Sequence, residues 1–146
     1  MAQLHHRALN RPALPQIAAA VVIHDGRLLL IHRAVPEPDL AWQLPAGKVE
    51  KDEKPTDAAA RENQEETGVA VRPDLLLGDR IHPVTGRHVF YVACTYLRGK
   101  PVPAAAEVAL AAWVPVHELP RFVPKGFYEP VQRYITDTAT GPRGLT

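Results

Sequence analysis

The first clear pattern is a pair of apolar runs around a turn dipeptide. Residues 17–23 and 27–33 are rich in aliphatic and β-branched side chains. Asp25 and Gly26, which separate them, tolerate the positive φ angles of a tight turn. We therefore predict a β-hairpin. Further strand-like runs are found at 42–44, 75–81, 88–96 and 108–114.

The segment 54–67 has the pattern of a helix. It contains no glycine, and its one proline, Pro55, stands where a first helical residue tolerates a missing N–H. Gly68 then supplies a stop signal. A second helix is predicted over 127–136. Strands gathered around a helix, mostly through hairpin connections, predict an α+β sandwich with a mixed sheet.

The length and the distribution of the pattern predict one folded unit. The chain has 146 residues and 46% hydrophobic content, which suits a single globular domain, and we place that domain at 16–137. Residues 1–15 and 138–146 show little periodicity and are expected to be a flexible arm and a flexible tail.

Charge and cysteine content narrow the classes of function. Lysine and arginine number 17 and aspartate and glutamate 16, without a run of like charge, which argues against nonspecific nucleic-acid or membrane-surface binding. Cys94 is the single cysteine, lies in an apolar stretch and is expected to be a core residue. The apolar run 17–23 is too short for a signal segment. We therefore expect a cytoplasmic protein.

Glutamates cluster on the predicted helix. Glu62, Glu65 and Glu66 stand at i, i+3 and i+4 and so share one face. For three glutamates alone, a solvated acidic surface is the simpler interpretation. The opposite stripe is polar, however, and we expect it to be a poor packing face: Thr56, Ala60, Asn63 and Thr67. Clustered carboxylates are also the ligands that Mg²⁺ prefers.

The spacing around this helix resembles that of a known family. The signature runs as Gly47, five residues, Glu53, seven residues, Arg61-Glu62, two residues, Glu65-Glu66, one residue, Gly68-Val69. This pattern resembles the Nudix box. The resemblance implies an α/β/α sandwich with a catalytic helix and extends weakly over most of residues 17–134. One departure is Asn63, where the family has an aliphatic residue beneath the helix, and an unpaired amide there costs roughly 1 to 3 kcal/mol.

The resemblance also implies roles for these side chains. Glu62, Glu65 and Glu66 would hold Mg²⁺, or Mn²⁺ as a substitute, together with the Gly47 carbonyl. Arg61 would pair with Glu53 to orient the cluster. The general base would be Glu62 or Glu65, and Glu107 on a later loop is a rival.

Other residues are weaker candidates. Arg33 ends the second strand, from which a guanidinium can reach a substrate phosphate, although a surface position is about equally compatible. Trp42, Phe90 and Tyr91 could stack on a base, and strand alternation places at least half of them in the core, with Trp113 more surely there. The histidines lack the spacing of a transition-metal site.

The function implied is hydrolysis of a nucleoside diphosphate linked to another moiety. The substrate would be a nucleoside triphosphate, with oxidised forms included, or ADP-ribose or a sugar nucleotide, bound by a monomer or homodimer without nucleic-acid or membrane partners. The alternative is a module that binds a nucleotide without cleaving it. Intact glutamates in the box favour the enzyme.

Overall fold

The structure, a computed structural model, describes residues 14–34 and 41–139. Residues 1–13 of the predicted arm and 140–146 of the predicted tail, together with residues 35–40, lie outside the described residues.

The predicted hairpin begins the fold. Strands β1 (Ile17–His24) and β2 (Arg27–Arg33) pair antiparallel around the turn, where Asp25 and Gly26 have φ angles of 53° and 73°. Strand β2 also pairs antiparallel with β7 (Val108–Pro115) along its whole length, and its last residues pair with β3 (Trp42–Gln43). The hairpin prediction and its turn chemistry are confirmed.

Strand β1 also pairs with a second group of strands, and this part of the sheet carries the site. Its neighbours are β4 (Ala46–Lys48), antiparallel, and β6 (His88–Arg98), parallel, and β5 (Ala70–Ile81) pairs antiparallel with β6 at the edge. The sheet is therefore mixed, as predicted. Strand β5 begins five residues earlier than the predicted run. Its register with β6 shifts on both sides of Pro73, so the strand includes this proline although proline has no N–H to donate.

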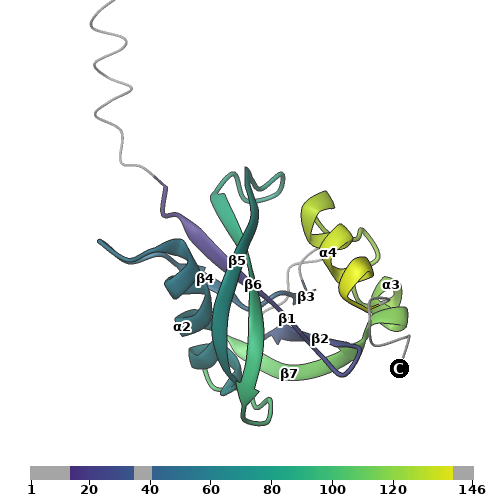
Figure 1. The fold of residues 1–146 in the computed structure, drawn as a ribbon. Helices are drawn as coiled ribbons and strands as arrows, with labels where there is room; N and C mark the ends of the chain where they lie inside the picture. The colour runs from purple at the N-terminus through teal and green to yellow at the C-terminus, as the bar shows by residue number, and fades with distance from the viewer. Residues whose placement is uncertain (1–13, 35–40, 140–146) are drawn as a thin grey trace, which may run out of the picture.

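Helices cover the two faces of this sheet (Figure 1). Helix α2 (Pro55–Thr67) lies on one side, and α3 (Leu119–Phe122) and α4 (Glu129–Ala139) lie on the other. A cluster that includes Ala18, Ala58 and Val92 fills the space under α2, and a second cluster that includes Leu30 and Ile135 fills the α4 side. This is the predicted α+β sandwich.

Our expectation that α2 packs poorly is wrong. Ala58 and Ala59 are fully buried against the sheet, and so are the side chains of Asn63 and Thr67. The two alanines are small enough to let the helix approach the strands closely. The polar residues of this face are partly satisfied by local hydrogen bonds, since Asn63 Nδ2 donates to the Val69 carbonyl at 2.9 Å and Thr67 Oγ1 donates to the Asn63 carbonyl at 2.7 Å.

The C-terminal helices differ from the prediction in their limits. The predicted helix at 127–136 becomes α4 at Glu129–Ala139, and its apolar side buries Val131 and Ile135. Helix α3, with the preceding 3₁₀ turn η1 (Val116–Glu118), was not predicted, because its four residues form little more than one helical turn and cannot show a repeating apolar pattern. Within the described ranges, no helix has the length and apolar character needed to cross a membrane.

Candidate functional site

Local signals at both ends of α2 set the positions of its glutamates. Pro55 occupies the first turn, and Gly68 ends the helix in the left-handed region with φ 75°, its N–H donating to the Gln64 carbonyl at 2.9 Å. Lys54 at the N-cap makes no side-chain cap bond. Because both ends are fixed, Glu62 and Glu66 fall one turn apart on the side that faces strand β4.

Gly47 is the point at which β4 and α2 approach most closely. A Cβ atom at this position would lie 2.0 Å from both Cδ and Oε2 of Glu62. No side chain fits there without moving that carboxylate. The glycine therefore lets the Glu62 carboxyl group lie directly against the backbone of β4, which confirms the predicted proximity of Gly47 to the acidic cluster.

Arg61 gathers four of the surrounding acceptors. Its guanidinium binds Glu53 through two hydrogen bonds, from Nε at 2.8 Å and Nη2 at 3.0 Å, and Nη2 also donates to the Lys48 carbonyl at 2.9 Å. Nη1 donates to Glu62 at 2.9 Å and to Glu65 at 3.1 Å. These hydrogen bonds lower the pKa of Glu53. The pairing of Arg61 with Glu53 is as predicted, and the bond from Arg61 to the Lys48 carbonyl ties the helix to β4.

Glu66 is a buried carboxyl group. Its side chain is 5% exposed, and Oε1 accepts the Ala46 N–H at 2.8 Å. Burial raises its pKa to about 7, although the Ala46 hydrogen bond and the positive charge of Arg33 oppose the shift. The negative charges of Glu62 and Glu107 add to the increase. Several carboxyl groups therefore lie close together in a partly desolvated site, where the ionised form of each disfavours ionisation of the others.

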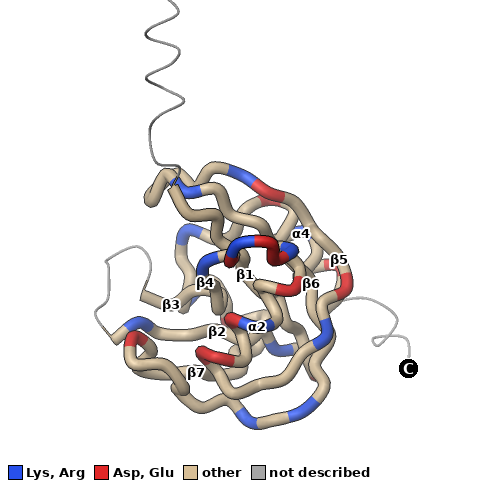
Figure 2. Tube along the Cα trace, turned by 90° about the vertical axis from the view of Figure 1, so that its left-hand side faces the viewer, with Lys and Arg blue, Asp and Glu red and all other residues tan. Residues whose placement is uncertain are grey.

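A cleft of about 860 Å³ opens beside these residues. Four of the predicted site side chains line it: Arg33, Glu62, Glu66 and Glu107. Gly47 also lines it, whereas Glu65, whose side chain is 55% exposed, does not. Figure 2 looks onto α2 and shows acidic and basic positions side by side on the helix and on neighbouring segments. The structure thus brings Glu62, Glu66 and Glu107 together and leaves Glu65 on the outer side of the helix.

The donor atoms in the cleft suit a hard divalent cation. Glu62 and Glu66 present carboxylate oxygens to the same space, and no ion pair within 4 Å involves Glu66 among residues 14–34 and 41–139. Within the same ranges, no three His, Cys, Asp or Glu side chains already surround a common point. Glu62 is instead turned toward Arg61. Oxygen donors that repel one another are the ligand type that Mg²⁺ and Mn²⁺ bind.

The weaker candidates separate into cleft and core residues. Arg33 donates to Gln43 Oε1 at 3.4 Å and lines the cleft, as do Trp42 and Tyr91. Phe90 points to the other side of β6 and stacks on His88, with ring centroids 4.5 Å apart, so it does not line the cleft.

Two residues expected in the core behave differently. Cys94 is 3% exposed, and burial raises the pKa of its thiol to about 12, which confirms a core residue and not a nucleophile. Trp113 is only half-buried, and it packs edge-on against Tyr96 at 5.6 Å.

Sequence reasoning missed the residues at the far end of the cleft. Arg80, Arg87, Lys125 and Tyr128 line it there. They come from β5, from the turn after it and from the segment before α4. No spacing in the sequence relates these segments, because only the pairing of β5 with β6 and the packing of α4 bring them together.

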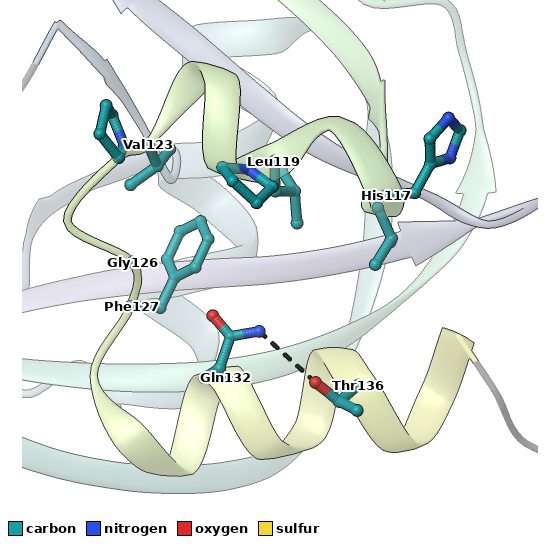
Figure 3. Close-up of a pocket in the computed structure, with 10 residues that line it drawn as sticks. His117, Leu119, Val123, Gly126, Phe127, Gln132 and Thr136 are labelled. Atoms are coloured by element: carbon teal, nitrogen blue, oxygen red, sulfur yellow. Dashed lines mark hydrogen bonds between the residues drawn. The ribbon is translucent and has the colours of Figure 1, made fainter.

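A second, smaller cavity of about 310 Å³ lies between α3 and α4 (Figure 3). Leu119 and Val123 line one side of it, and Phe127 and Gln132 line the other. Gln132 Nε2 donates to Thr136 Oγ1 at 3.4 Å. No lysine, arginine or carboxylate is among its lining residues, and His117 is the only ionisable side chain there, so it lacks the carboxylate cluster and the basic groups of the larger cleft.

Comparisons with known proteins agree with this geometry. A model of the NUDIX domain matches residues 14–137. A "MutT-like protein" of Streptomyces ambofaciens is 48% identical over 62 residues, which cover 42% of this chain and only 38% of that relative. A "Putative 8-oxo-dGTP diphosphatase 2" of Mycobacterium tuberculosis is 37% identical over 114 residues, covering 73% of this chain and 77% of the relative.

Solved structures show the same fold. The crystal structure of a NUDIX hydrolase from Nitrosomonas europaea superposes with a TM-score of 0.74 at 23% identity, covering 90% of this chain and 76% of that one.

Proposed function

The chain belongs to the Nudix hydrolase family, and we propose that it hydrolyses a diphosphate bond in a nucleoside triphosphate, releasing the nucleoside monophosphate and pyrophosphate. Nudix hydrolases generally use a divalent metal, and we propose Mg²⁺ here, with Mn²⁺ as a substitute. The observation that carries the proposal is the pair of glutamates, Glu62 and Glu66, on the wall of a cleft large enough for a nucleotide.

One feature supports a triphosphate over the other substrates that the box permits. The diphosphatase relative that spans most of the chain is named for an oxidised deoxyguanosine triphosphate, so oxidised purine triphosphates come first in our expectation. The cleft also contains the aromatic side chains of Trp42 and Phe127, with which the base of any purine nucleotide can stack.

We assign roles from the positions of the side chains. Glu62 and Glu66 would hold the metal, together with the Gly47 carbonyl and Glu65. The metal would supply neutralisation of phosphate charge and a lowered pKa of water. Arg61 and Glu53 fix Glu62 beside β4, and Arg33 binds a phosphate oxygen.

Glu107 is our candidate for the general base. It lines the cleft, whereas Glu65 lies outside it and Glu62 is engaged by Arg61. A base must lie within hydrogen-bond reach of the attacking water, and a carboxylate beside the proposed ligands is placed to meet that need. Glu107→Gln should lower kcat about 10²-fold while Mg²⁺ affinity is retained. An unchanged kcat would return the base to the helix.

The test of the function is a substrate panel. The protein is incubated with Mg²⁺ and nucleoside triphosphates, including an 8-oxopurine, and with ADP-ribose, sugar nucleotides and dinucleoside polyphosphates, and products are separated. We expect pyrophosphate and a monophosphate from a triphosphate, and complete loss of turnover in EDTA that Mg²⁺ or Mn²⁺ reverses. Turnover that persists in EDTA would refute the metal assignment. Tight binding of a nucleotide without any cleavage would show a sensor in place of an enzyme.

A further inference from the structure

The floor of the cleft connects an acidic end to a basic end. Strand register places Lys48 beside Ile17, Ile17 beside Val89, and Val89 beside Arg80, in one row across β4, β1, β6 and β5. All four side chains line the cleft. Since neighbouring strands lie about 4.8 Å apart, the row spans roughly 14 Å. Arg80 therefore lies across the cleft from the glutamates of α2.

Arg80 is held in place by aromatic side chains. Its Nε donates to the Tyr91 hydroxyl at 3.1 Å, and its guanidinium carbon lies 4.8 Å from the centroid of Tyr128. Tyr128 is fixed in turn, because its hydroxyl donates to the Asp79 carbonyl at 3.0 Å and its ring rests on Gly78. A Cβ at Gly78 would lie 3.2 Å from that ring. The guanidinium is therefore preorganised by aromatic rings in place of a carboxylate.

Among the described residues that line the cleft, the charged ones at this end are basic. Arg87 and Lys125 line it beside Arg80, and the acids of the lining, Glu62, Glu66 and Glu107, belong to the opposite end. Within the described part of the chain, no ion pair involves Arg80. Burial and the charge of Arg80 lower the pKa of His82, whose Nδ1 accepts the Val84 N–H at 3.1 Å. That histidine shapes the turn.

We propose that this basic end, formed by Arg80, Arg87 and Lys125, binds a further phosphate of the substrate, beyond the diphosphate held at the acidic end. The enzyme then prefers nucleoside triphosphates and longer polyphosphates over nucleotides whose diphosphate is joined to a neutral sugar. The argument rests on the proposed function for the identity of the substrate. The cleft orients the phosphate chain because its two ends differ in charge: the three glutamates at one end outnumber the basic side chains until a cation binds, and the other end is basic without a metal.

Binding without metal tests the site independently of catalysis. Inorganic tripolyphosphate is titrated into the protein in EDTA and followed by calorimetry. We expect one site, weakened about 10-fold or more in Arg80→Gln, as for the loss of a hydrogen bond to a charged group. Arg98→Gln, at the other end of β6 and outside the cleft, is the matched control and should bind as the wild type does.

Further variants keep the test sound. Arg80→Lys retains the charge and should bind more tightly than Arg80→Gln. Arg87→Gln changes an exposed side chain and should also weaken binding, so the proposal stays testable if Arg80→Gln fails to fold. The proposal is overturned if the wild type does not bind tripolyphosphate in EDTA, if the Arg80 and Arg98 variants bind equally well, or if Arg80→Lys is as weak as Arg80→Gln.

A kinetic experiment tests the preference itself. The ratio of kcat/KM for a nucleoside triphosphate to that for ADP-glucose should fall about 10-fold in Arg80→Gln and remain constant in Arg98→Gln. An unchanged ratio in Arg80→Gln overturns the proposed preference. If the wild type cleaves neither substrate, the proposed function fails, and tripolyphosphate binding still decides whether the anion site exists.

Discussion

The two faces of helix α2 are built to opposite requirements. The face toward the sheet buries Ala58, Ala59 and Asn63 completely and makes few charged contacts. The face toward the cleft holds Glu62 and Glu66, whose burial raises the pKa of both carboxyl groups. The first face stabilises the fold, and the second costs stability because charge is concentrated where water is partly excluded. A functional site can therefore be recognised as the helix face that buries charged side chains although their burial does not stabilise the fold.

The largest expected effect comes from Glu66→Gln, which removes charge from the cleft face and keeps the shape. We expect kcat to fall about 10² to 10⁴-fold, because the variant loses a proposed metal ligand. The free energy of unfolding in EDTA should rise, because a buried charge disappears. Steady-state kinetics and denaturant titration measure the two. Asp57→Asn, an exposed acid in the first turn of the same helix, is the control. Loss of stability together with activity would show that the two faces are not separate.

A second effect is the pH dependence of the metal-free protein. The pKa of Glu66 is about 7 in the folded state against 4.5 for an unperturbed glutamate, so the folded state binds the proton more tightly. The free energy of unfolding should therefore fall as the pH rises from about 4.5 to about 7, by on the order of 3 kcal/mol for this group. Below that window the opposite trend is expected from Glu53, whose pKa is lowered, since its contribution is lost as the pH falls.

Denaturant titrations at several pH values, in EDTA, measure this dependence. Saturating Mg²⁺ should reverse the fall near neutral pH, because a cation that binds the ionised folded form stabilises it. Glu66→Gln should flatten the curve between about pH 4.5 and 7. A wild-type curve that is flat in this range would show that the pKa of Glu66 is the same in the folded and unfolded states. The cleft face would then not destabilise the fold through its buried charge.

Gly47→Ala perturbs the contact between the cleft face and β4. The added methyl group would lie 2.0 Å from the Glu62 carboxyl, which must then move away. We expect kcat to fall about 10-fold, with Mg²⁺ affinity reduced, since a displaced ligand binds less well. Gly86→Ala, at a turn glycine with open space around its Cβ position but a φ of 72°, strains the backbone without touching Glu62, so it should cost stability and leave Mg²⁺ affinity unchanged. Equal kinetics in Gly47→Ala and the wild type would exclude a close approach of Glu62 to β4 during catalysis.

The sequence predicted the cleft face of α2 better than the sheet face. Helix limits, the turn at Asp25 and the pairing of Arg61 with Glu53 follow from local spacing, which a sequence displays directly. The basic end at Arg80 depends on strand register and on the packing of α4, so no local pattern contains it. The burial of Asn63 was predicted only through the family resemblance. The polar stripe by itself led to the wrong conclusion about packing, because hydrogen bonds along the helix satisfy part of it.

The smallest effect concerns Asn63, the one polar side chain that the sheet face satisfies incompletely. Its Nδ2 donates to the Val69 carbonyl, but Oδ1 is buried without a hydrogen-bond partner among the described residues. Asn63→Leu has nearly the same branching. It removes the unpaired oxygen, worth about 1 to 3 kcal/mol, and takes the donor from the Val69 carbonyl at a similar cost, while burial of the apolar side chain adds about 1 kcal/mol. We therefore expect the free energy of unfolding to rise by about 1 kcal/mol with kcat unchanged. Asn63→Asp is the control: it keeps an oxygen, loses the donor and adds charge, so it should destabilise the protein strongly. A stability loss in Asn63→Leu would mean that the bond to Val69 outweighs the unpaired oxygen, and a loss of turnover with folding intact would mean that the sheet face takes part in catalysis.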